Sequence, residues 1–102
     1  MQINRVPLGR ACRLYSDILN GNIGVVGEVP KIIMRRLSDS KYWNDSNSTW
    51  QEAVYENVLP AIDGTNMPGL YGYVFTIWED MIVRCKNTGT YAFDEYSAWL
   101  LV

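Results

Sequence analysis

The stretch LYGYVFTIWEDMIVRCK, residues 70–86, decides the fold because it fits two kinds of secondary structure. One helical face would collect its apolar side chains, namely Leu70, Val74, Ile77, Trp78, Met81, Ile82 and Cys85. The same stretch is rich in strand formers, namely Tyr71, Tyr73, Val74, Phe75, Thr76 and Ile77. We favour the helix, because its face persists over four turns and Glu79-Asp80 makes a poor two-residue hairpin turn. The alternative is an α+β fold with a β-hairpin or small antiparallel sheet in residues 70–93.

The segments on either side of this stretch also show helical patterns. Residues 7–19 have apolar side chains at helical spacing, with Pro7 in the first turn, and a second helix is expected over residues 30–37. Two overlapping capping boxes at Ser48 and Thr49 predict a third helix that ends or kinks at Pro60, and a last helix is expected after Thr90. The sequence therefore predicts a mainly α fold, a compact single-core bundle of four to five short helices.

Length and composition predict one domain over residues 1–102. The chain is 48% hydrophobic and 20% charged, with four Trp and seven Tyr, which is typical of a folded core and not of a disordered chain. No signal-peptide pattern or membrane-length apolar run is seen, so we expect a cytoplasmic protein with no membrane partner. In a reducing compartment its two cysteines, Cys12 and Cys85, are expected to be free thiols.

The chain has no histidine, and this excludes several kinds of active site. A Ser-His-Asp or Cys-His arrangement cannot be built, nor can a His-ligated zinc site, and two cysteines cannot complete a tetrahedral thiolate site. Chemistry based on carboxylate, Lys, Tyr or Ser-Lys groups is what remains. We therefore expect a protein that is not an enzyme and that uses no cofactor or metal.

Charge is divided unevenly along the chain. Residues 1–51 hold seven Lys or Arg against four acids, whereas residues 52–102 hold two against seven. On a helix, Ile32 would stand among Lys31, Arg35 and Arg36, like an apolar anchor with a charged rim. The alternatives are a solvated helix face with one exposed Ile, and charges of the two halves that pair inside the fold.

Two further groups of residues are candidate partner-binding sites. Tyr42 and Trp43 lie in a polar loop where no periodic face requires them, and they can serve as a binding anchor or as a lid on the core. Two carboxylate pairs form the second candidate surface, namely Glu79, Asp80, Asp94 and Glu95. Such pairs can imitate phosphates for a basic partner, and their alternative is a set of solvated helix ends.

These features favour a non-enzymatic protein-interaction module that binds and masks a surface of a larger partner protein. Small inhibitors, immunity proteins and phage or mobile-element accessory proteins work in this way. One alternative is an acidic nucleic-acid mimic, or a direct nucleic-acid binder that uses Arg10, Arg13, Arg35 and Arg36. A small carboxylate-dependent enzyme is the third hypothesis, and a homo-oligomer is compatible with the first.

Overall fold

The computed structural model describes residues 1–102, and it contains strands and turns but no helix. The prediction of a mainly α bundle is therefore wrong. Residues 81–87 show why, because Met81, Val83 and Cys85 are buried while the residues between them are less so. This alternation with a period of two is that of a strand with one face in a core. No helix long and apolar enough to cross a membrane is present.

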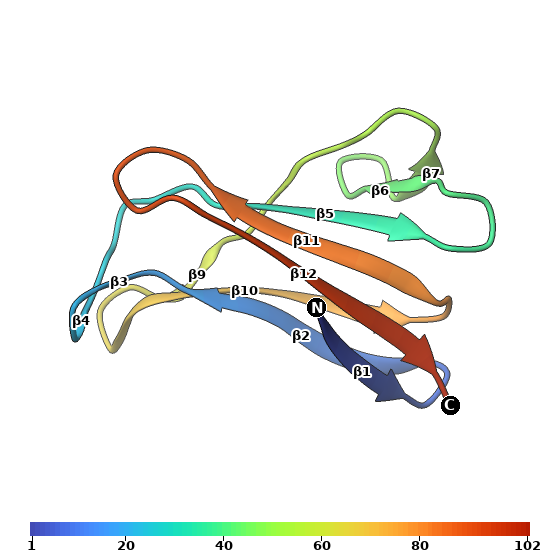
Figure 1. Ribbon diagram of the computed structural model, residues 1–102, viewed down its shortest axis with the longest axis horizontal. Helices are drawn as coiled ribbons and strands as arrows, with labels where there is room; N and C mark the ends of the chain where they lie inside the picture. Colours follow the sequence, from blue (N-terminus) through green and yellow to red (C-terminus); the bar gives the residue numbers. More distant parts are fainter.

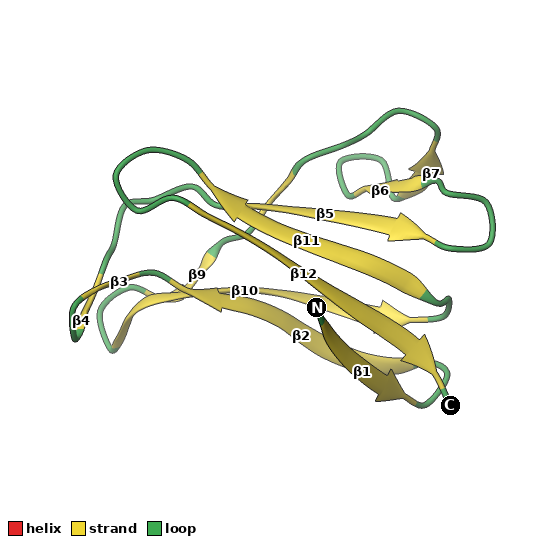
Figure 2. Ribbon diagram, in the orientation of Figure 1, coloured by secondary structure: helices red, strands yellow, loops and turns green.

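Twelve strands follow one another along the chain (Figure 1). Their bounds are β1 (Gln2–Val6), β2 (Arg10–Asp17), β3 (Leu19–Asn20), β4 (Ile23–Gly24), β5 (Lys31–Arg36), β6 (Tyr42–Asn44), β7 (Thr49–Gln51), β8 (Asn57–Val58), β9 (Ala61–Asp63), β10 (Met67–Ile77), β11 (Met81–Asn87) and β12 (Phe93–Leu101). Turns and loops connect all of them (Figure 2).

The strands form two main sheets. The larger has the order β1-β12-β11-β5-β6-β7, with β8 paired to β5, and the smaller has the order β2-β10-β9. Neighbouring strands are antiparallel except for β1 and β12, which are parallel. The two sheets lie face to face, and the β3–β4 hairpin lies at one end (Figure 1).

The stretch 70–86 forms two strands of different sheets. β10 pairs with β2 in the smaller sheet, whereas β11 pairs with β5 and β12 in the larger one. Trp78, Glu79 and Asp80 carry the chain from one sheet to the other, so no two-residue hairpin turn is needed there. The alternative prediction is closer to the structure, since β11 and β12 form an antiparallel hairpin that turns through residues 88–92.

The other expected helices are also strands or turns. Residues 10–17 form β2, residues 31–36 form β5, and residues 48–60 contain only the short strands β7 and β8. A helix over residues 7–19 would bury Leu8 and Tyr15, yet both are exposed. Ser48 is not an N-cap but lies in the tight turn between β6 and β7, with a φ of 55°.

The strand order is that of a variable-type immunoglobulin sandwich. In such domains one sheet contains strands G, F, C, C′ and C″ and the other contains B, E and D. Here β12, β11, β5, β6 and β7 take the first set of positions and β2, β10 and β9 take the second, in matching chain order. The disulfide that joins strands B and F in antibody domains has no counterpart, because Cys12 of β2 and Cys85 of β11 are both free thiols.

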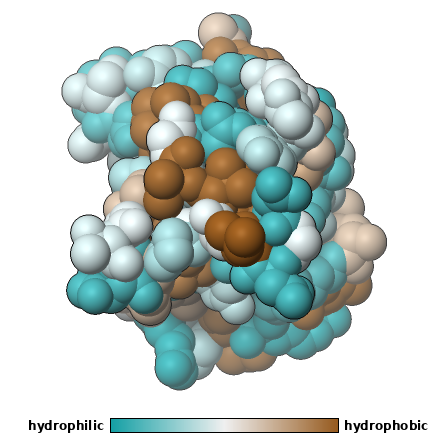
Figure 3. Space-filling view, turned by 90° about the vertical axis from the view of Figure 1, so that its left-hand side faces the viewer, coloured by the Kyte–Doolittle hydropathy of each residue, from teal (hydrophilic) through white to brown (hydrophobic).

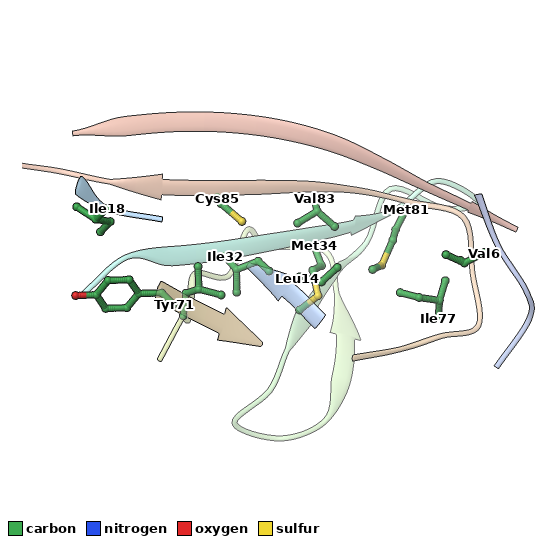
Figure 4. Packing of buried hydrophobic residues seen from close by; sticks show 11 residues of the cluster. Val6, Leu14, Ile18, Ile32, Met34, Tyr71, Ile77, Met81, Val83 and Cys85 are labelled. Carbon is green, nitrogen blue, oxygen red and sulfur yellow. The ribbon is translucent and has the colours of Figure 1, made fainter. Parts of the chain in front are cut away.

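The core lies between the two sheets (Figure 4). The larger sheet contributes inward rows from β5 and β11, and the smaller sheet faces them with rows from β2 and β10. The buried cluster consists of Val6, Leu14, Ile18, Ile32, Met34, Leu59, Tyr71, Ile77, Met81, Val83 and Cys85. Burying one large aliphatic side chain contributes about 1.5–3 kcal/mol, so this cluster is the main source of stability.

Asn57 is a buried polar residue that links three segments. Its Nδ2 donates to the carbonyl oxygens of Ile32 and Trp43 at 3.2 and 3.1 Å. Its Oδ1 accepts from the backbone N–H of Asp45 at 3.0 Å. Asn57 is the first residue of β8, so these bonds add to the β5–β8 pairing and also fix β8 to β6 and to the β6–β7 turn.

We expect Asn57→Ala to lower the free energy of unfolding by at least about 2 kcal/mol, because three backbone groups would lose their partner in a buried place. Chemical denaturation followed by Trp fluorescence measures the change. Asn22→Ala, which alters an exposed asparagine, is the matched control and should change stability little. A loss below about 0.5 kcal/mol in Asn57→Ala would contradict this role.

Candidate functional site

Exposed apolar side chains gather among polar ones at the end of the sandwich that carries the β3–β4 hairpin (Figure 3). We call it the apolar end and define it by Leu19, Ile23, Val26, Val29 and Met67, which are each between 43% and 71% exposed. Single exposed apolar residues are common, but a contiguous group on one face marks an interaction surface.

Close backbone contacts hold the hairpin against the start of β10. The Ile18 N–H donates to the Gly69 carbonyl at 2.8 Å. A Cβ on Gly24 would lie 1.9 Å from the Pro68 carbonyl oxygen, and a Cβ on Gly69 would lie 2.6 Å from the Ile18 carbonyl oxygen. The approach therefore requires glycine at both positions, and Gly69 in addition has a φ of +86°.

A buried tyrosine fixes the loop behind the hairpin. The Tyr71 hydroxyl donates to the Val25 carbonyl at 2.9 Å and accepts from the Glu28 N–H at 3.2 Å. These two bonds order the backbone that carries Val26. An interaction surface that is ordered before binding loses less conformational entropy when it binds.

The apolar end is not among the predicted partner-binding surfaces. It includes part of the Gly-rich residues 21–27, in which Ile23 and Gly24 form β4. The sequence does contain a pattern that indicates this surface. Four apolar residues stand close together in a stretch with no helical period, namely Ile23, Val25, Val26 and Val29.

The structure separates the members of the basic candidate group. The prediction that Ile32 is an exposed anchor is wrong, because Ile32 lies in the core with 0% exposure. Alternation along β5 puts Ile32, Met34 and Arg36 on the inner face and Arg35 on the outer face. On a helix Ile32, Arg35 and Arg36 would share a face, whereas on a strand neighbouring residues point to opposite sides.

Arg36, Trp43 and Glu79 lie together at the end of the sandwich opposite the apolar end. The Arg36 guanidinium lies 4.8 Å from the centre of the Trp50 ring and 3.8 Å from Glu79. The Trp43 ring packs edge-on against Trp50, with ring centres 5.3 Å apart. Trp43 also packs against the core, as the lid alternative predicts.

Arg35 and Tyr42 lie on the outer face of the larger sheet. They are cross-strand partners in β5 and β6, and Arg35 also pairs with Ile82 of β11. The Arg35 Nη1 donates to the Ser40 hydroxyl at 3.3 Å. Tyr42 and Trp43, which are neighbours in the sequence, therefore belong to different surfaces.

The four acidic candidates do not converge. Asp94 forms a bidentate pair with Arg84, with N–O distances of 2.6 and 2.8 Å, while the next residue, Glu95, lies in the inward-facing row of β12. Asp80 accepts from the Leu101 N–H at 2.7 Å. Since Leu101 is six residues beyond Glu95 in one strand, the two carboxylate pairs are separated by about 20 Å.

The cationic residues considered for nucleic-acid binding are also spread out. Arg10 and Arg13 lie in β2 of the smaller sheet, whereas Arg35 and Arg36 lie in β5 of the larger sheet. Among the ion pairs, Arg36 with Glu79 joins the basic half of the sequence to the acidic half. The pairs Arg36–Asp39, Arg84–Asp94 and Lys86–Glu56 each lie within one half.

The two thiols differ in environment. Cys85 is buried beside Ser16, and burial raises the pKa of its thiol more than the contact with Ser16 lowers it. Cys12 is half-buried in β2. No group of three or more Cys, Asp or Glu side chains is arranged to hold a metal ion.

No protein-family model matches the chain, and no curated protein matches it. Among solved structures, it is similar to the one described as "Crystal structure of the ZIG-8 IG1 homodimer". The identity is 12% and the TM-score 0.49, over 99% of this chain and 78% of that chain. A likeness at this level carries no argument about function.

We expect Gly24→Ala to detach the β3–β4 hairpin from β10, because the new methyl group would overlap the Pro68 carbonyl. The free energy of unfolding should fall by about 1–3 kcal/mol. Hydrogen exchange should also become faster at the Ile18 and Val25 amides, which hold this hairpin. Gly64→Ala is the matched control, since a Cβ there meets nothing within 4 Å, and unchanged exchange in Gly24→Ala would contradict the close contact.

The Arg84–Asp94 pair makes stability depend on pH. Hydrogen bonding to Arg84 lowers the pKa of Asp94 below its usual value, so its contribution is present above about pH 4 and is lost as the pH falls through the lowered pKa. We expect Asp94→Asn to be less stable than wild type at pH 7 and to approach it at lower pH. Denaturant titrations between pH 7 and 2 measure this, with Glu95→Gln as control, and parallel curves for Asp94→Asn and wild type would contradict it.

Proposed function

We propose that the protein is a non-enzymatic interaction module that docks its apolar end on a larger partner protein. The observation that carries this proposal is the exposure of five large apolar side chains at one end of the sandwich, where apolar surface gathers (Figure 3). Exposed apolar area is unfavourable in water and favourable when another surface covers it. A partner of matching shape would therefore gain free energy from this end without any rearrangement of the core.

The order of the patch supports the proposal. Leu19 and Ile23 stand on a paired hairpin, and the hydroxyl of the buried Tyr71 holds the loop that follows it. A flexible loop with the same composition would lose more entropy on binding. Apolar anchors on a rigid base are typical of the centre of protein interfaces.

Four carboxylates with lowered pKa values support a role without catalysis. Asp39, Asp94 and Glu56 have lowered pKa values because each is hydrogen-bonded to a basic side chain, and the pKa of Asp63 is lowered by bonds to the turn at Thr65 and Asn66. These carboxylates support ion pairs and a turn, whereas a general acid needs a raised pKa near neutral pH. The narrower classes of inhibitor, immunity protein and phage accessory protein stay predictions.

The test uses the double variant Leu19→Asp with Ile23→Asp, which places two charges at exposed positions of the apolar end. A partner captured from the native host with wild-type protein would first be identified and purified, and its affinity then measured by calorimetry. We expect the double variant to bind at least about 100-fold more weakly, since two buried apolar contacts become buried charges.

Two controls accompany this measurement. Leu8→Asp changes a residue of similar exposure in the turn between β1 and β2, away from the apolar end, and should leave the affinity unchanged. Thermal unfolding should show that the double variant remains folded. Equal affinities of the double variant and wild type for the purified partner would overturn the proposal.

A further inference from the structure

Part of β10 has a backbone edge that no strand covers. β10 pairs with β2 over Leu70–Ile77, but its pairing with β9 ends at Tyr71. The last bond on the β9 side is donated by the Gly72 N–H to the Pro60 carbonyl at 2.9 Å. Because alternate residues of a strand direct their backbone groups to the same side, the N–H and C=O groups of Val74 and Thr76 face this open edge.

An aromatic pocket lies directly beside the open edge. Its volume is about 410 Å³, and Val74 and Thr76 are among its lining residues. The aromatic lining consists of Trp43, Trp50, Tyr73, Phe75 and Trp78. We call it the aromatic pocket, and it is separate from the apolar end, which lies at the start of β10.

The pocket walls are held in place by ring packing. The Trp43 ring lies edge-on to Phe75 with ring centres 5.3 Å apart, and its Nε1 donates to the Tyr73 hydroxyl at 3.3 Å. Trp78 is 60% exposed, yet its ring packs against Gly9, where an added Cβ would lie 2.9 Å from the ring. An exposed but fixed indole at the rim can contact a ligand at little entropic cost.

The charges around the pocket favour a cationic ligand. The Arg36 guanidinium, next to Trp50 of the pocket, already pairs with Asp39 at 2.6 Å and with Glu79 at 3.8 Å. Asp45 lies close to the Tyr73 hydroxyl, where together with burial it raises the pKa of that group. Glu79 is the charged residue among those that line the pocket, and aromatic faces also attract cations.

We propose that the Val74–Thr76 edge and the aromatic pocket together bind an extended peptide segment of another protein, with one Lys or Arg side chain in the pocket. The peptide adds to β10 as a strand, and its backbone pairs with the free groups of Val74 and Thr76. Side chains of an added strand alternate between the two faces, so the cationic side chain enters the pocket while its neighbours point to solvent. Glu79 is then its counter-ion.

The test uses three blocked pentapeptides, acetyl-Thr-Val-Xaa-Val-Thr-amide, in which Xaa is Lys, Leu or Glu. Nitrogen-15 NMR of the intact protein would follow each titration. We expect the Lys peptide to shift the Val74 and Thr76 amides saturably and to bind at least tenfold more tightly than the Glu peptide. A Lys peptide with N-methyl groups on its two valines should bind at least tenfold more weakly, because it cannot complete the backbone pairing.

Two protein variants test whether the charge of Glu79 contributes to peptide binding. Glu79→Gln should lower the affinity for the Lys peptide three- to tenfold and leave the affinity for the Leu peptide unchanged. Glu95→Gln, which alters an exposed carboxyl in β12, should change neither affinity. Binding of the Leu peptide as tight as that of the Lys peptide would overturn the proposal, as would saturation without shifts at Val74 and Thr76. Concentration-dependent shifts of these amides without peptide would assign the edge to a second copy of the chain and also overturn it.

Discussion

The burial of Ile32 and Met34 on β5 is the interaction on which the rest of the structure depends. Both side chains have 0% exposure and face the smaller sheet from the middle of the larger one. Because side chains alternate along a strand, this burial also directs Arg35 to the outer face. The same strand sets the positions of the loop before it, which carries part of the apolar end, and of the turn after it, which carries Asp39.

The two surfaces of functional interest are built differently. Backbone contacts order the apolar end, where two glycines allow the hairpin and β10 to approach closely. Side-chain packing orders the aromatic pocket, and Asn57 holds the strand that presents Trp43. The two surfaces lie at opposite ends of β10 and share no residue.

The helical interpretation failed because a sandwich strand between two apolar layers can imitate a helical pattern. In residues 70–86, Ile77 and Met81 are both buried, and their spacing of four residues suits a helix. They belong to different strands, and the intervening turn moves the chain from one sheet to the other. The weakness of Glu79-Asp80 as a hairpin turn was correctly identified, but the conclusion did not follow, since β10 and β11 are not hairpin partners.

The sequence by itself determined which chemistry the chain lacks, since the absence of histidine depends only on composition. It also identified Trp43, Arg36 and Glu79 as residues of interest, although not as neighbours. Only the tertiary structure decided which side chains meet, because the strand pairs are distant in sequence: β1 pairs with β12, and Arg36 of β5 reaches Glu79 in the connection between β10 and β11. A strand gains its partner from another part of the chain, whereas a helix bonds within itself. For this reason local patterns did not reveal the burial of Ile32 or the exposure of Ile23.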